Sequence, residues 1–189
     1  YCPLRLEGTS RRVSLIPDEL AAFFINLCRR KNLIGIFLSS GMLDNPDKSM
    51  QLLIDTASIL RYKYSYRGFI HTKIIPGAST ESIIKAVSLS SAVSLNIETP
   101  GETYFSKLSS RKKYLTDIIE PLKLISTLTD KHSRYKGVST STQFIVGASD
   151  EPDQEIVKYM WGLYDRLNFN RIYFSSYQKG LGQPDIPGE

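Results

Sequence analysis

The stretch Val93-Ser94-Leu95-Asn96-Ile97-Glu98 decides the fold, because aliphatic and polar side chains alternate along it. Successive side chains of a strand point to opposite faces of a sheet, so the polar ones share one face. A parallel sheet covered by helices on both sides would be apolar on both faces. One face of this predicted strand therefore meets something polar.

Four further apolar runs have strand length and are rich in β-branched and aromatic residues. Together with the run above, the predicted strands are residues 34–39, 68–75, 92–97, 142–147 and 171–177. Segments with helical spacing lie before and between them, and the predicted helices are residues 17–31, 46–63, 80–90, 112–131 and 152–168. Ser14 and Asn45 are the expected start signals of the first two helices.

Regular alternation of strands and helices predicts an α/β fold with a parallel sheet, either an open doubly wound sheet or a barrel. The polar face of the predicted strands distinguishes a barrel from an open doubly wound sheet. His71 and Lys73 share a face of the second strand, and Ser175 and Tyr177 share a face of the last. Inward polar residues near the carboxyl ends of several strands are typical of barrels. Five strands cannot close an eight-stranded barrel, so we expect an open partial barrel that lacks its first strand.

Composition narrows the class of protein. Hydrophobic residues make up 41% of the 189-residue chain and charged residues 23%, which is typical of one soluble globular domain. No apolar run approaches the roughly 20 residues that span a bilayer, so no membrane association is expected. Two cysteines, Cys2 and Cys28, form no disulfide framework and favour a reducing, cytoplasmic setting. The absence of GxGxxG, GxxxxGK[ST], HExxH and GxSxG motifs removes support for common nucleotide triphosphatases and hydrolases.

The net charge of +5 suits contact with a polyanion, so a non-catalytic nucleic-acid-binding module is an alternative function. Phosphate contacts would make its binding steeply dependent on salt. A metabolic enzyme with a parallel barrel and no iron-sulfur cluster is a further alternative.

Three positions after predicted strands could bind a ligand. The small residues Ser39-Ser40-Gly41 allow close approach to the backbone, although a plain turn has the same composition. Asn96 and Glu98 offer the donors and acceptors that a ribose diol needs, and the alternative is a solvated strand end. Gly147 permits close backbone approach or a simple bulge.

His71 and Lys73 are candidates for substrate contact or proton transfer, because both lie on the predicted inner face. The alternative for His71 is a strand histidine that is simply hydrogen-bonded.

Taken in chain order, these segments resemble the radical S-adenosylmethionine superfamily across nearly the whole chain. Tyr1-Cys2 is similar to the end of its CxxxCxxC motif, and Cys2 would then be the third ligand of a 4Fe-4S cluster. The resemblance implies that residues 1–189 are a single core domain cut from a longer protein at both ends. It also implies a partial (β/α)6 barrel in which strands two to six are present.

The resemblance implies a set of contacts to S-adenosylmethionine, namely Ser39, Ser40, Gly41, Asn96, Glu98, Gln143, Ile145, Gly147, Ser175 and Tyr177. Three positions depart from the superfamily pattern. Ser39-Ser40-Gly41 stands in place of GGE, Gln143 replaces the first glycine of GxIxGxxE, and Asp150 stands where glutamate is usual.

The activity implied by the resemblance is reductive cleavage of S-adenosylmethionine, with an electron from a donor such as flavodoxin or ferredoxin. The resulting 5'-deoxyadenosyl radical would abstract hydrogen from a substrate, which His71 and Lys73 would contact. More narrowly, residues 68–77, 94–98 and 173–177 are similar to a radical SAM subgroup named for DNA modification or repair. Nucleic acid is therefore an expected partner both for an enzyme of this subgroup and for the non-catalytic binding module.

Overall fold

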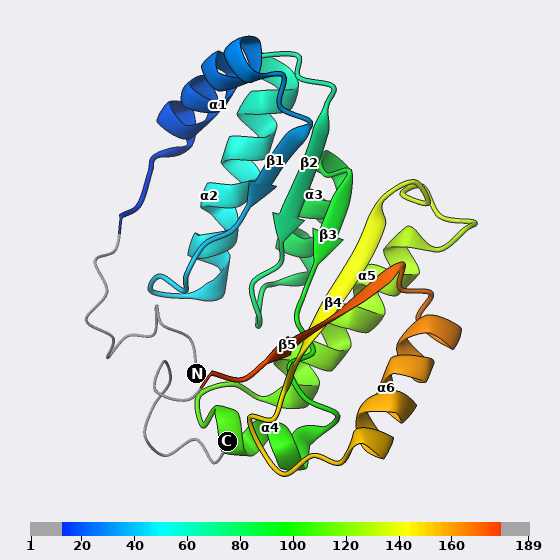
Figure 1. Cartoon of the computed structure of the whole chain (residues 1–189). Helices are drawn as coiled ribbons and strands as arrows, with labels where there is room; N and C mark the ends of the chain where they lie inside the picture. Colours follow the sequence, from blue (N-terminus) through cyan, green and yellow to red (C-terminus); the bar gives the residue numbers. More distant parts are fainter. Residues whose placement is uncertain (1–12, 179–189) are drawn as a thin grey trace.

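The computed structural model describes residues 13–178, and these form a five-stranded sheet in which every pairing is parallel (Figure 1). The strands pair in the order β1-β2-β3-β4-β5, which is also their order along the chain. Their bounds are β1 Gly35–Leu38, β2 Phe69–Lys73, β3 Ala92–Ser94, β4 Ser139–Val146 and β5 Arg171–Ser176. The predicted α/β class and the five predicted strands are confirmed.

The helices alternate with the strands, as predicted. Their bounds are α1 Pro17–Lys31, α2 Pro46–Ser58, α3 Thr80–Leu89, α4 Glu102–Leu108, α5 Glu120–Thr129 and α6 Asp153–Asp165. Two π-helical segments extend them, with η1 at Ile59–Lys63 continuing α2 and η2 at Leu115–Ile119 preceding α5. Among residues 13–178, only α4 has no counterpart in the predicted helices.

The start signals of the first two helices had different outcomes. Asn45 caps α2, because its side chain accepts a hydrogen bond of 2.8 Å from the amide of Lys48. The assignment of Ser14 as the start of α1 is wrong. Ile16 precedes the helix without a side-chain cap, and Pro17 begins it, since proline at the first position supplies a helical φ.

Four other predicted boundaries shift by three residues, one of which is the end of α6, at Asp165 instead of residue 168. The strand predicted at 142–147 begins three residues earlier, at Ser139, and the helix predicted at 112–131 begins with η2 at Leu115. The third strand ends at Ser94, because the amide of Ile97 is bonded at 2.9 Å by the hydroxyl of Thr142 instead of a strand carbonyl. Asn96 and Glu98 therefore follow a strand and do not lie within it.

The two faces of the sheet differ, as the alternation in residues 93–98 predicts. Helices α2, α3 and α5 lie behind the sheet in Figure 1, against the face that carries the fully buried Ile70, Val93 and Phe144. Register places Phe37, His71, Lys73, Ser94, Gln143 and Tyr173 on the opposite face, which we call the open face. Phe37 is 57% exposed and Tyr173 49%, so no helix of the described chain covers the margins of the open face.

Candidate functional site

A cluster of polar side chains lies at the carboxyl ends of β2 and β3, on the open face. The ammonium group of Lys73 donates to Oδ1 of Asn96, and Nδ2 of Asn96 lies 3.5 Å from Oε2 of Glu98. The structure thus brings together three of the predicted site residues. Because carboxyl ends of parallel strands meet at one edge of a sheet, this edge is where ligands bind in α/β proteins.

Glu98 is held in an unusual backbone conformation. Its amide donates to the carbonyl of Gln143 at 3.0 Å, and its carbonyl accepts from the amide of Ile145 at 2.8 Å. These bonds attach it to β4 while its φ is +67°, in the left-handed region that non-glycine residues seldom adopt. The residue is only 6% exposed. A buried carboxylate on a strained backbone costs stability, and such positions gather at functional sites.

His71 lies beside this cluster, two residues before Lys73 on β2. Its Nε2 is 2.9 Å from the hydroxyl of Ser94, and its ring meets the edge of Phe37 with 4.6 Å between ring centres. Burial, together with the charge of Lys73, lowers the pKa of His71 to about 4. The imidazole is therefore neutral at pH 7 and can hydrogen-bond a ligand without adding charge.

This lowered pKa makes stability depend on pH. Between about pH 6.5 and pH 4 the unfolded chain binds a proton at His71 that the folded chain does not, so stability falls as pH falls through this window. We expect His71→Gln to lose less stability than the wild type between pH 7.5 and pH 4.5. Urea unfolding at several pH values measures this, with His132→Gln, at an exposed position, as the control. Parallel profiles for wild type and His71→Gln would contradict it.

Lys73 is half-buried, and burial lowers its pKa, with Lys112 adding to the effect and Glu98 opposing it. Lys112 was not among the predicted site residues. It comes from the segment before η2, far along the chain, so no local pattern pointed to it.

The segment after β1 contains Ser39, Ser40 and Gly41. The hydroxyl of Ser40 donates to the carbonyl of Gly41 at 2.8 Å. Among residues 13–178, nothing lies within 4 Å of the place where a side chain on Gly41 would begin. Within that part of the chain, the backbone at Gly41 has free space beside it.

The loop after β4 is organised by a residue that the sequence analysis missed. Glu151 accepts hydrogen bonds from the amide of Gly147 at 2.8 Å and from the amide of Ser149 at 3.0 Å. Asp150, at the expected glutamate position, instead pairs with Lys107 of α4, and this pairing lowers the pKa of Asp150. The carboxylate that shapes the loop lies one residue further along the chain than the pattern indicated.

The remaining predicted contacts lie around this loop. Gly147 has a φ of +81° and is exposed, so its backbone can be approached closely. Ile145 and Tyr177 pack against a small apolar cluster formed by Leu108 and Ala148. In addition, the amide of Tyr177 donates to the carbonyl of Val146 at 2.8 Å, which ties the end of β5 to β4.

Two predicted residues line the strands themselves. Gln143 is half-buried on β4 and pairs in register with Tyr173, while Ser175 is exposed on β5 and pairs with Ile145. The structure thus orders the predicted contacts along one edge of the sheet, from the loop after β1 to the end of β5. Cys2 lies outside the described residues.

Comparison with known proteins leaves the family open. No family model matches the chain, and no curated protein matches it significantly. The geometry of the open face therefore carries the functional argument.

Within residues 13–178, no three or more histidine, cysteine, aspartate or glutamate side chains gather in a group that could hold a metal ion. No helix in the same range is both long and apolar enough to cross a membrane.

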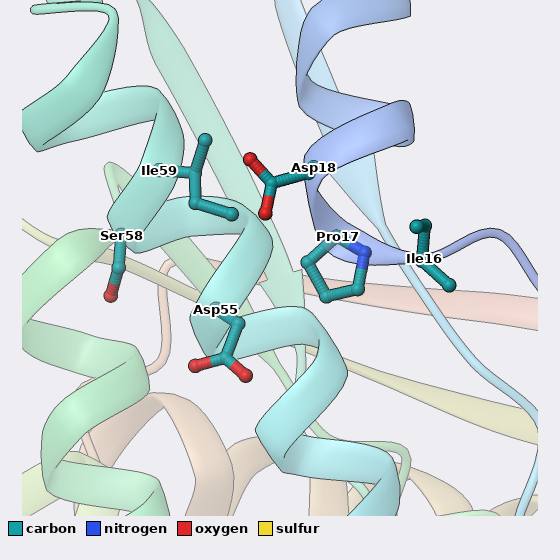
Figure 2. A pocket seen from close by; sticks show the side chains of 6 residues that line it. All are labelled: Ile16, Pro17, Asp18, Asp55, Ser58 and Ile59. Atoms are coloured by element: carbon teal, nitrogen blue, oxygen red, sulfur yellow. The ribbon is translucent and has the colours of Figure 1, made fainter.

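A pocket of about 360 Å³ lies elsewhere, between the start of α1 and the end of α2 (Figure 2). Its lining residues are Ile16, Pro17, Asp18, Asp55, Ser58 and Ile59. Both carboxylates already have partners, since Lys63 donates to Asp18 at 2.7 Å and Gln51 to Asp55 at 2.7 Å. The pocket contains none of the predicted site residues and is separate from the cluster on the open face.

Proposed function

We propose that this chain is the core of a radical S-adenosylmethionine enzyme and binds S-adenosylmethionine on the open face, along the carboxyl edge of the sheet. The observation that carries the proposal is the buried, strained Glu98 joined to Asn96 and Lys73 at that edge. Polar groups gathered at the carboxyl edge of a parallel sheet suit a polar ligand, because they offer both hydrogen-bond donors and acceptors.

The fold supports this proposal. In a barrel of the radical SAM type, helices surround the sheet and the ligand occupies the inner face. Helices α2, α3 and α5 lie against one face of the five-stranded sheet, and the proposal assigns the open face to the interior of a partial (β/α)6 barrel. The first strand of that barrel would pair with the outer edge of β1.

The ribose is the part of the ligand that the cluster fits best. Its two hydroxyls need acceptors and a donor, which the Glu98 carboxylate and the Asn96 amide provide. The 3.5 Å separation of these groups is long for a hydrogen bond. Lys73 holds Asn96 from the opposite side and fixes which end of the amide faces the carboxylate.

The other contacts follow the same edge. Ser39, Ser40 and Gly41 would face the amino group of the methionyl part, because carbonyls in an open turn can accept its hydrogen bonds. Gln143 and Ile145 on β4, Gly147 just after it, and Ser175 and Tyr177 at the end of β5 would contact the adenine. The Tyr177 ring already packs there against an apolar cluster.

In the proposal, Cys2 and two cysteines upstream of Tyr1 hold a 4Fe-4S cluster. Such a cluster supplies the electron that cleaves the sulfonium bond of S-adenosylmethionine and so yields a 5'-deoxyadenosyl radical. The described residues position the nucleoside and exclude water from it. His71, neutral at pH 7, and Lys73 would contact the substrate, which in this interpretation is a component of nucleic acid.

Anaerobic reconstitution of the natural full-length protein with iron and sulfide tests the proposal. With dithionite and S-adenosylmethionine, we expect stoichiometric 4Fe-4S spectra and formation of 5'-deoxyadenosine. The 189-residue chain alone has one cluster ligand of three, so it should not retain a stable cluster. A full-length protein that neither holds a cluster nor cleaves S-adenosylmethionine would rule the proposal out.

A further inference from the structure

We propose that Tyr114 is a positioning residue that fixes the Glu98 carboxylate by clamping the buried turn after it. The inference rests on the proposed function for its effect on ligand binding, but the clamp itself can be measured without ligand.

The clamp consists of two hydrogen bonds to opposite sides of one turn. The hydroxyl of Tyr114 donates to the carbonyl of Thr99 at 2.8 Å and accepts from the amide of Gly101 at 3.2 Å. The hydroxyl of Thr99 also donates to the carbonyl of Gly101, at 3.1 Å. A single phenol thus satisfies one acceptor and one donor of the backbone, directly after Glu98.

The whole assembly is buried. Tyr114 is 5% exposed, and Thr99, Pro100 and Gly101 are all buried as well. Burial raises the pKa of the Tyr114 phenol, with nearby Tyr159 contributing, so the hydroxyl remains protonated and able to donate. Because the turn is buried, water cannot readily replace the phenol. A buried backbone group that loses its partner lowers stability, since it stays desolvated without a hydrogen bond.

The turn has no freedom to relax on its other sides. Gly101 has a φ of +121°, and a Cβ at this position would lie 3.1 Å from the hydroxyl of Tyr159 on α6. The ring of Tyr114 packs against Phe105 of α4, with ring centres 5.2 Å apart. Thus α4 and α6 both support the turn that Tyr114 clamps.

Glu98 lies between two anchors. On one side its amide and carbonyl bond to β4, and on the other the Tyr114 clamp begins one residue later. Its left-handed φ can persist only because the backbone is fixed on both sides. Removing the clamp should loosen the backbone at Glu98 and so shift its carboxylate.

The test is Tyr114→Phe in the natural full-length protein, which removes one oxygen and keeps the ring. We expect the dissociation constant of S-adenosylmethionine, measured anaerobically by calorimetry, to rise about 10-fold. Tyr66→Phe is the matched control. It removes a buried hydroxyl three residues before β2, at the end of that strand opposite Lys73, so affinity should not change.

A double-mutant cycle separates positioning from a general structural effect. If Tyr114 acts through Glu98, adding Tyr114→Phe to Glu98→Gln should change the dissociation constant less than 2-fold. An equal 10-fold loss in both backgrounds would overturn the inference.

Amide hydrogen exchange provides the readout without ligand. Tyr114→Phe should accelerate exchange at Gly101 and Glu98 at least 10-fold, while amides of α2 keep their rates. If the wild type does not bind S-adenosylmethionine, the proposed function fails, and exchange alone decides the clamp. Unchanged exchange at both amides would overturn it, and acceleration at both would support it.

Discussion

Replacement of Glu98 by glutamine is expected to lower the rate of S-adenosylmethionine cleavage by at least about 100-fold, which corresponds to about 2.7 kcal/mol. Glutamine has almost the same shape, so packing around this buried position is retained. It removes the negative charge and one acceptor, however, and a hydrogen bond from a ribose hydroxyl to a charged carboxylate is stronger than one to an amide. The loss should appear in kcat/KM for 5'-deoxyadenosine formation.

Glu102→Gln is the control for this substitution. Glu102 lies four residues further along, in the first turn of α4, and is exposed. The same chemical change there should leave kcat/KM within 2-fold of wild type. Equal activity of Glu98→Gln and Glu102→Gln would contradict a role for Glu98 in binding the nucleoside.

Replacement of Phe144 by alanine is expected to lower the free energy of unfolding by about 4 kcal/mol. Phe144 is fully buried on β4 and stacks on Phe174 of β5, with ring centres 5.6 Å apart. Truncation would leave a cavity between the sheet and its helices, and the surrounding strands can close over it only in part. Because domains of this size are stable by roughly 5–15 kcal/mol, the loss would be a large share of the total.

Urea unfolding measures this loss as a lower midpoint at constant slope. Phe174→Ala is the control, because Phe174 belongs to the same stacked pair but is 50% exposed. It should cost about 1 kcal/mol, since it removes less buried area. Equal losses at the two positions would show that β4 does not lie at the centre of the core.

Sequence patterns predicted those features of the fold that depend on residues close together in the chain. The alternation in residues 93–98 correctly assigned one apolar and one polar face, because side-chain direction along an extended chain is fixed by geometry. Asn45 was recognisable as a helix cap because its side chain bonds an amide only three residues further along the chain. The end of β3 was not predictable, because the hydroxyl of Thr142, distant in sequence, takes the place of a strand carbonyl.

The polar residues of the site were predictable from the sequence, but the residues that hold them in place were not. His71, Lys73, Asn96 and Glu98 stood out because polar residues at strand ends indicate binding. The supporting groups did not, since Tyr114 reaches the turn from a separate segment and carries no motif of its own.

The two carboxylates after β4 are a more local example. Asp150 and Glu151 are adjacent, and only the hydrogen bonds of the folded loop distinguish the one that binds the backbone from the one that pairs with α4. Helix α4 itself has seven residues, which is too short for a clear apolar period.

The order of the strands has a consequence for synthesis on the ribosome. Within residues 13–178, each strand pairs only with the strands immediately before and after it in the chain. As the polypeptide emerges, the edge that a new strand needs has already been made, and no early strand has to wait for a distant partner. The sheet can therefore grow by one strand and one helix at a time, in step with translation.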